Sequence, residues 1–295
     1  MAKYFQIFIQ SFTGYFNYLI SEITFQYDYK AWYENYFYWL ILVSLTVWFL
    51  EIGMPWRKNQ NKIRKDFWLD VFYMFFNFFL VSLIGYNALS NMGVELFNDF
   101  LKLLGYKNII LIQIGHLPRW TQYLLLFVVA DFIQWNIHRL LHRFDALWSF
   151  HKVHHSVKEM GFAAHLRFHF METILYKTIQ FIPLSMLGYS ITNLFWLHIT
   201  TVLIGHLNHA NLNWDYGWFR YIFNNPKMHI WHHVKVLPQE HRFGVNFGLS
   251  LSLWDYWFKT AYLPKDGRDI ELGFDDDEHF PKQFRAQMTE PFKSS

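Results

Sequence analysis

The chain has 295 residues, of which 53% are hydrophobic and 22% are aromatic, and its formal net charge at pH 7 is only +3. Such an aromatic excess is typical of lipid-facing helices and interfacial belts, and the small charge without a long basic tract argues against a nucleic-acid partner. Because the sequence contains no cysteine, disulfides, thiolate iron–sulfur clusters, c-type haem attachment and cysteine nucleophiles are excluded within it.

The N-terminal part of the sequence predicts an interfacial helix followed by a first membrane span. Residues 1–35 are amphipathic and aromatic, and they lack the basic start and cleavage site of a removed signal peptide. The apolar run from Tyr36 to Gly53 approaches the roughly 17–25 residues that a spanning helix needs. The loop 56–66 that follows is rich in lysine and arginine, which predicts a cytoplasmic position, although a merely solvated loop fits the same topology.

Further apolar segments predict an all-α integral membrane bundle of about four to five spans. They lie at residues 71–86 and 122–137, and in a helical hairpin over residues 173–209 that turns near Gly188 to Thr192. Lys177, near the start of the hairpin, is expected to reach the headgroups. This topology places the histidine-rich motifs described below on the cytoplasmic side, where we expect them to form a helical cap that holds a metal site.

The chain becomes more polar after Asn211, and residues 254–257 are expected to lie in a short interfacial helix. The acidic run at residues 275–279 predicts a solvated cap over the cytoplasmic side. No repeat or linker divides the chain. We therefore expect an interfacial segment (1–35), one transmembrane and histidine-rich domain (36–265) and a polar tail (266–295).

Histidines are concentrated in four short motifs. Ten of the 16 lie in HRLLH (138–142), HKVHH (151–155), HLNH (206–209) and HIWHH (229–233). On a helix, residues three or four apart share a face, so each motif directs its imidazoles the same way. A catalytic zinc uses about three protein ligands and a structural one about four, so this number of histidines indicates two metal ions. Imidazole suits iron, zinc, copper and nickel, so the ligand type leaves the metal open.

Asp131 is a charged residue inside the span predicted at 122–137. It lies seven residues before His138, about 20° around the helix, where a carboxylate is costly unless it is paired. We expect it to accept a ring N–H from a ligating histidine and so to orient that imidazole. The alternative is an ion pair with Arg167 or Arg139 that holds helices together.

The order of these motifs resembles the membrane fatty acid hydroxylase superfamily, also called the sterol desaturase family, over about residues 120–265. The matching positions are Asp131, Trp135, His138-Arg139, His142, LWSFHKVHHS (147–156), Arg167-Phe168-His169 with Glu172, His209-Ala210-Asn211, PKMHIWHH (226–233) and NFGLSLSLWDYWF (246–258). Glu51 and Pro55 are candidates for an extension of the match. The sequence departs from the family pattern at two positions, where Phe170 replaces a proline and Lys259 replaces a glycine. Because of these departures, the resemblance does not define the shape of the substrate channel.

The resemblance implies a non-haem di-iron oxidoreductase that uses O₂ to hydroxylate, or desaturate, a C–H bond of a lipid. Zinc can take the place of iron in such a site. The metal ligands that the resemblance implies are His138, His142, His151, His154, His155, His209, His229, His232 and His233, with His206 as a plausible addition. It further places Asp131, Arg167 and Glu172 in supporting positions around the catalytic site.

The source of electrons has to be separate, because the sequence contains neither a GxGxxG dinucleotide motif nor a cysteine cluster. A cytoplasmic reductase, a ferredoxin or a cytochrome b5-like protein would fill this role, or a pterin, as in the alkylglycerol monooxygenase branch of the superfamily. Three other readings stay open: an acyl-lipid desaturase, a histidine-rich metal transporter and a bis-histidine haem carrier. Fatty acyl lipids, sterols, ether lipids, carotenoids and aminolipid headgroups are all possible substrates.

Overall fold

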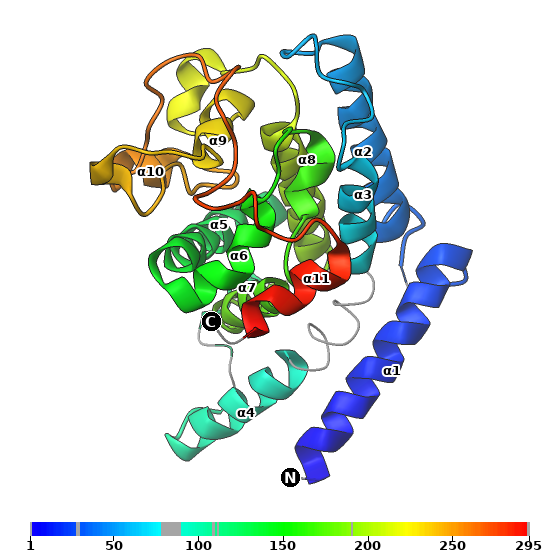
Figure 1. The fold of residues 1–295 in the computed structure, drawn as a ribbon. Helices are drawn as coiled ribbons and strands as arrows, with labels where there is room; N and C mark the ends of the chain where they lie inside the picture. The colour runs from blue at the N-terminus through cyan, green and yellow to red at the C-terminus, as the bar shows by residue number, and fades with distance from the viewer. Residues whose placement is uncertain are drawn as a thin grey trace.

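The computed structural model describes residues 2–27, 30–77, 90–107, 110, 112–189 and 191–293, and the regular elements in this part of the chain are helices (Figure 1). The α-helices are α1 (Ala2–Thr24), α2 (Tyr36–Gly53), α3 (Phe67–Phe75), α4 (Ser90–Leu103), α5 (Arg119–Arg143), α6 (Asp145–His155), α7 (Phe170–Ser185), α8 (Ile191–His209), α9 (Pro226–His232), α10 (Leu253–Trp257) and α11 (Phe284–Thr289). The short 3-10 helices are η2 (Phe162–Leu166), η3 (Gly217–Tyr221), η4 (Gln239–His241) and η5 (Glu290–Phe292).

Two helices of the described chain, α2 and α5, are long and apolar enough to cross a membrane. They coincide with the spans predicted at 36–53 and 122–137, and α7 and α8 occupy the two halves of the predicted hairpin. The segment predicted at 71–86 begins in α3, but residues 78–89 lie outside the described residues, as do residue 190 in the hairpin turn and the side chain of Lys177. A bundle of four to five spans with a cytoplasmic cap therefore stays a prediction.

Helix α2 is fixed at both ends by polar side chains. At its start, the Asn35 side chain accepts a hydrogen bond from the Tyr38 amide at 3.1 Å, which satisfies one of the free N–H groups of the first turn. Near its end, Glu51 Oε1 accepts from the amides of Phe162 (2.9 Å) and Asn211 (2.7 Å). Glu51 thus ties α2 to η2 and to the residues that follow α8.

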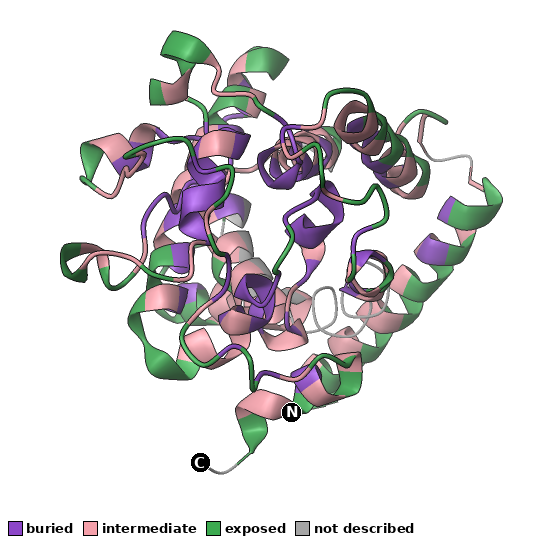
Figure 2. Cartoon of the chain, turned by 45° about the horizontal axis from the view of Figure 1, so that its top comes forward, coloured by how far each residue is buried: buried purple, intermediate pink, exposed green. Residues whose placement is uncertain are grey.

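The largest apolar cluster joins α5 to α8 and to the loop around α10. It contains Leu126, Phe127 and Trp135 of α5 together with Leu197 of α8 and Trp254 of α10. Figure 2 shows buried residues concentrated inside this body, whereas α1 at the edge is mostly exposed. Within α1 only Leu19 and Glu22 are buried. Its exposed apolar side chains include Phe5, Ile9 and Phe16, and the interfacial position of this helix stays a prediction.

Four of the five residues in the acidic run 275–279 are exposed, as predicted for a solvated cap, but Asp277 is buried. Asp277 is only 6% exposed and pairs with Lys158 and Lys235. In α11, Gln287 Oε1 accepts a hydrogen bond from the hydroxyl of Tyr73 in α3 at 2.7 Å. A buried carboxylate is stable only with such partners, and these two lysines come from segments far away in the sequence. The tail therefore fastens α3, α6 and α9 together.

Candidate metal centre

Nine of the ten histidines predicted as ligands come together in two groups, and all of them are buried except the half-buried His142. The first group contains His138, His142, His151, His155 and His232, and the second contains His154, His209, His229 and His233. In each group, the potential ligand atoms lie within 4.8 Å of one another. The helices that carry them contact one another in the pairs α5 with α6, α5 with α8 and α8 with α9 (Figure 1). The two groups adjoin, since the rings of His155 and His233 stack with centroids 4.5 Å apart.

Each HxxHH motif divides its histidines between the two groups. The sequence predicted instead that the histidines of one motif would share a face. His151 and His155 belong to the first group and His154 to the second, whereas His229 and His233 belong to the second and His232 to the first. The reason is the helical repeat of about 100° per residue, which places positions i+3 and i+4 on opposite sides of position i. One turn of helix can therefore bridge two ions.

The ring nitrogens of the first group face one another in a way that calls for a cation. His138 Nδ1 donates to the carbonyl oxygen of Phe247 at 2.7 Å, and His151 Nδ1 donates to Glu172 Oε1 at 2.9 Å. In a neutral imidazole, donation from Nδ1 leaves the lone pair on Nε2. The Nε2 atoms of His138 and His151 lie 3.1 Å apart, so two lone pairs would repel unless a positive ion lay between them. The geometry fits a bound metal.

The second group has matching distances. Nε2 of His209 lies 3.2 Å from Nε2 of His154 and 3.0 Å from Nε2 of His229, which in turn lies 3.2 Å from Nε2 of His233. Two nitrogens bound at right angles to one ion, each at about 2.1 Å, are about 3.0 Å apart. His209 Nδ1 donates to the Gly205 carbonyl at 2.8 Å, so its Nε2 also carries a lone pair. The spacing is that of ligands around a single ion.

Burial keeps these imidazoles neutral, which is the form that binds metals. In α6, burial is the largest cause that lowers the pKa of His151, His154 and His155 well below the ordinary value, and neighbouring histidines lower it further. The pKa of His233, directly after α9, is lowered for the same reasons. His142 Nε2 is buried and has no hydrogen-bond partner, so it too offers a free lone pair.

A carboxylate and backbone carbonyls orient the rings from behind. Glu172, at the start of α7, is buried and contacts His151 directly. The resemblance places it among the supporting residues of the catalytic site, and that role stays a prediction. Val245 O accepts from His232 Nδ1 at 2.7 Å, in the same way that Phe247 O accepts from His138. Partners of this kind fix the tautomer and the orientation of a ligand, and they raise its basicity.

Asp255 supports this arrangement, although the sequence analysis gave it no role. Its carboxylate accepts hydrogen bonds from four groups: Trp135 Nε1, Phe247 N, Gly248 N and Thr260 Oγ1. Burial raises its pKa, and these four donors oppose that effect. Because Phe247 also accepts from His138, Asp255 holds the loop that orients this histidine. The sequence WDY, which contains Asp255, was one of the matching motifs. Its link to His138 through Phe247 depends on contacts across the fold, which the spacing of residues in the sequence does not show.

Asp131 does not contact a histidine or an arginine, so both sequence-based expectations for it were wrong. Its oxygens accept from the amides of Ser250 (3.0 Å) and Leu251 (3.2 Å) and from Trp254 Nε1 (2.9 Å). The carboxylate is buried, and these donors stabilise it. Asp131 therefore joins α5 to the loop before α10. Its partners are backbone amides more than a hundred positions away, which sequence spacing cannot reveal.

Arg167 and His206 also lie outside the two groups. Arg167 Nη1 is 3.2 Å from Asp70 Oδ1 and 3.3 Å from Asp66 Oδ2, so it connects η2 to the start of α3. His206 has its Nε2 3.0 Å from Ser44 Oγ and its Nδ1 3.1 Å from Nδ1 of His165. Position 206 is three residues before His209, about 60° around α8, so it faces α2 instead of the second group.

His165 is a further buried histidine that sequence reasoning missed. Its ring centroid lies 5.2 Å from that of His209 and 5.1 Å from that of His206. The only signal was its four-residue spacing from His169, which caps α7 by accepting from the Met171 amide. His165 and His206 thus form a second layer of imidazoles behind His209.

A cavity of about 770 Å³ adjoins both groups. One end is lined by His138 and His151 of the first group and by His154, His209 and His229 of the second. From there it extends between α5, α7 and α8 to the junction of α1 with α2, and most of its middle is apolar. This size is in the range of cavities that hold small molecules, so a long apolar molecule can lie with one end at the histidines.

The family model for fatty acid hydroxylases matches residues 123–260, the range that contains all nine grouped histidines. Ornithine lipid hydroxylase OlsE of Rhizobium tropici is 34% identical over 175 residues, which are 59% of this chain and 51% of the relative. Alkylglycerol monooxygenase is 27% identical over 170 residues in Xenopus tropicalis (55% of this chain, 35% of the relative) and 28% identical over 150 residues in Homo sapiens (48% and 30%). No solved structure matches the chain.

The chain spans about half the length of the first of these relatives and about a third of the other two. The matched range begins in α5 and ends after α10, so it includes every helix that carries a grouped histidine. Residues 123–260 therefore form a domain that matches the fatty acid hydroxylase family, and the chain is similar to members of the membrane fatty acid hydroxylase superfamily.

Proposed function

We propose that this protein is a membrane-bound oxygenase that holds two iron ions and uses O₂ with external electrons to hydroxylate a C–H bond of a lipid. The observation that carries the proposal is the convergence of nine imidazoles, eight of them buried and that of His142 half-buried, in two adjoining groups at one end of the cavity. The proposed ligands are the five histidines of the first group and the four of the second. The lipid substrates in the names of the relatives support the same assignment.

Iron bound by these groups would supply the activation of O₂. Hydroxylation puts one oxygen atom into the C–H bond and releases the other as water, which consumes two electrons and two protons. Because the chain has no cysteine and no dinucleotide motif, we propose a separate donor: a reductase, a ferredoxin, a cytochrome b5-like protein or a pterin. Two fully nitrogenous ligand sets suit iron and exclude easily oxidised thiolates.

The residues of the chain would bind, orient and shield the reacting groups. Glu172 holds His151 through Nδ1, and the carbonyl oxygens of Phe247 and Val245 hold His138 and His232. The apolar middle of the cavity would exclude water and align a hydrocarbon chain against the histidines. In the membrane, we propose that the histidine groups lie on the cytoplasmic side, where the basic loop 56–66 would also be found.

The proposal is tested by growing cells with and without the protein under ¹⁸O₂ and comparing their lipids by mass spectrometry. We expect one lipid class to gain a single labelled oxygen only when the protein is present. A lipid that loses two hydrogens without label would indicate a desaturase instead. Altered metal uptake with no change in any lipid would favour a transporter and would refute the oxygenase.

A further inference from the structure

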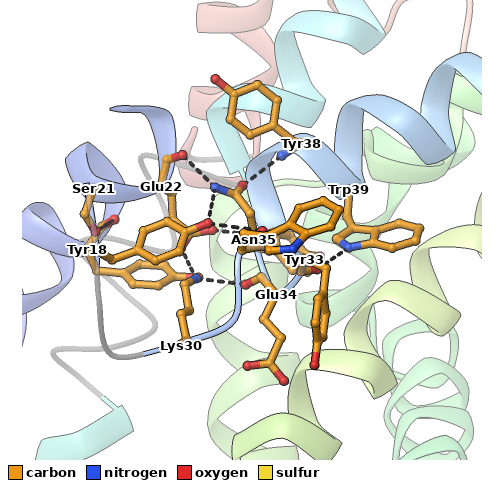
Figure 3. Close-up of polar contacts among 12 residues, drawn as sticks. Tyr18, Ser21, Glu22, Lys30, Tyr33, Glu34, Asn35, Tyr38 and Trp39 are labelled. Atoms are coloured by element: carbon orange, nitrogen blue, oxygen red, sulfur yellow. Dashed lines mark hydrogen bonds and ion pairs between the residues drawn. The ribbon is translucent and has the colours of Figure 1, made fainter. Parts of the chain in front are cut away.

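The end of the cavity opposite to the histidines is charged and aromatic (Figure 3). Among the described lining residues, the acidic and basic side chains are Glu22, Lys30 and Glu34, and all three lie at the junction of α1 with α2. Among these described side chains, Glu22 pairs with the Lys30 ammonium, whereas the carboxylate of Glu34 has no cationic partner. The described residues that line the histidine end of the cavity include no carboxylate.

Glu22 and Lys30 form the fixed part of this end. Glu22 is 1% exposed, pairs with the Lys30 ammonium and accepts from the amide of Tyr36 at 2.7 Å. The ammonium of Lys30 also donates to the Glu34 carbonyl at 2.8 Å and lies 4.9 Å from the ring centroid of Tyr18 and 4.6 Å from that of Tyr27. Carboxylates combined with tyrosine rings are the surroundings that stabilise an ammonium group.

The carboxylate of Glu34 is the part that is open to a ligand. Its side chain lines the cavity and makes no hydrogen bond or ion pair with any described residue. Figure 3 shows this carboxylate directed away from the Lys30 ammonium. The tyrosines 15, 18 and 36 line the same end. An amine that entered there would meet a free carboxylate and aromatic rings, the same kind of surroundings that Lys30 already occupies.

The distance to the metal end sets the orientation of such a ligand. The rings of Tyr36 and His198 lie 6.1 Å apart, which places His198 of α8 beside the charged end. His209 is eleven residues further along the same helix, about 16 Å at 1.5 Å per residue. A headgroup held near Glu34 would therefore keep its own atoms far from the histidines and send its hydrocarbon chain toward them.

We propose that the α1–α2 end of the cavity binds the amine-bearing headgroup of a lipid, so that the oxidised carbon belongs to the hydrocarbon chain and not to the headgroup. This inference rests on the proposed function for its chemistry, but the headgroup site itself can be tested without turnover. It also gives a role to residues 1–35, which precede the matched family range.

The first experiment measures lipid binding by the purified full chain, without turnover. The protein is purified in mild detergent from cells that contain both phosphatidylethanolamine and phosphatidylglycerol, and the retained lipids are quantified. We expect phosphatidylethanolamine to be enriched in the wild type and about fivefold less enriched in Glu34→Gln, because a carboxylate–ammonium contact is lost. Glu34→Lys should shift the preference to phosphatidylglycerol, and Glu240→Gln, an exposed control in η4, should leave it unchanged. Equal retention by all four proteins would overturn the headgroup site.

The second experiment locates the label in the ¹⁸O₂ products by tandem mass spectrometry. We expect the labelled oxygen in fragments of the hydrocarbon chain of an amine-bearing lipid, with less product in Glu34→Gln. Label in the headgroup fragment would overturn the proposed orientation and leave the oxygenase intact. If no lipid is labelled although Glu34 still selects amine-bearing lipids, the oxygenase proposal fails and the headgroup site remains.

Discussion

The group to which a histidine of this protein belongs depends on which other imidazole its ring faces. The spacing of the motifs alone does not show which one that is. His154 and His155 are neighbours in the sequence, yet His154 faces His209 and His155 faces His232. Because each HxxHH motif contributes to both groups, each histidine of these two motifs would bind one proposed ion directly and would affect the other through its helix. This makes single substitutions informative.

His154→Ala should remove one of the four ligands of the second group while the first group keeps all five. We expect bound metal to fall from two ions toward one per chain, and the labelled lipid to disappear. Elemental analysis of the purified protein measures the metal content. His116→Ala serves as the control, since His116 is exposed and distant in sequence from all four motifs. A His154→Ala protein with two ions and normal turnover would remove His154 from the ligand set.

Glu172→Gln should weaken the metal site without changing its shape. The amide that replaces the carboxylate keeps the size of the side chain but loses the charge that accepts the Nδ1–H of His151. We expect metal affinity to fall by roughly 10- to 100-fold, the usual effect of losing such a partner. Competition with a chelator measures this. Affinity equal to that of the wild type would show that Glu172 does not tune His151.

At the scale of elements, the close approach of α8 to η2 depends on a glycine. A Cβ atom at Gly205 would lie 2.1 Å from Nε2 of His165, and His165 cannot move freely because it is packed against His206 and His209. The close contact between α8 and η2 therefore requires that position 205 has no side chain. Gly14, in α1, has no atom within 4 Å of such a Cβ.

Gly205→Ala should lower stability by about 1–3 kcal/mol through overpacking, and it should disturb the second group through His209. Gly14→Ala is the matched control and should raise stability by about 0.5–1 kcal/mol, because α1 is an exposed helix at this position. Thermal midpoints in detergent compare the two. If both substitutions shift the midpoint equally, the contact between Gly205 and His165 does not hold α8 in place.

The elements that could be predicted from the sequence are those with a strong local signal. The apolar run 36–53 forms α2, and the run 122–137 lies inside α5, because length and composition decide these helices. The predicted partners of Asp131 were wrong because it accepts hydrogen bonds from the amides of Ser250 and Leu251. Only the fold brings these distant residues together. Asp277 was expected in solvent for the same reason, since neither of its lysine partners is near it in sequence.

At the scale of the whole molecule, the histidine centre couples stability to pH. The pKa of His155 and of His233 is lowered from 6.5 by burial and by neighbouring imidazoles, so the unfolded chain binds protons that the folded chain does not. Stability should therefore be complete above about pH 6.5 and fall as the pH decreases below that value. Metal binding acts in the same direction, because the ions need the neutral rings.

We expect the thermal midpoint of the purified protein to drop between pH 7.5 and pH 5.5, together with release of metal. Each histidine that is protonated only after unfolding contributes about 1.4 kcal/mol per pH unit. The midpoint and the metal content are measured on the same samples. A midpoint that stays constant or rises over this range would mean that the grouped imidazoles are not held neutral in the folded protein.

The candidate site was predictable in membership but not in arrangement. Four dense motifs were enough to select nine histidines that the fold brings together. They did not separate His206, which faces Ser44 instead, and they did not find His165. The division within each HxxHH motif follows the helical repeat, but which histidines of α5 and α8 complete each group depends on how the helices pack.

The most direct test of the account is the metal content of the freshly purified protein, measured per chain together with its absorption spectrum. The account predicts two non-haem ions per chain, with iron bound when the protein is produced in iron-replete medium, and no Soret band. One ion or none after reconstitution with iron, or a haem spectrum, would contradict it.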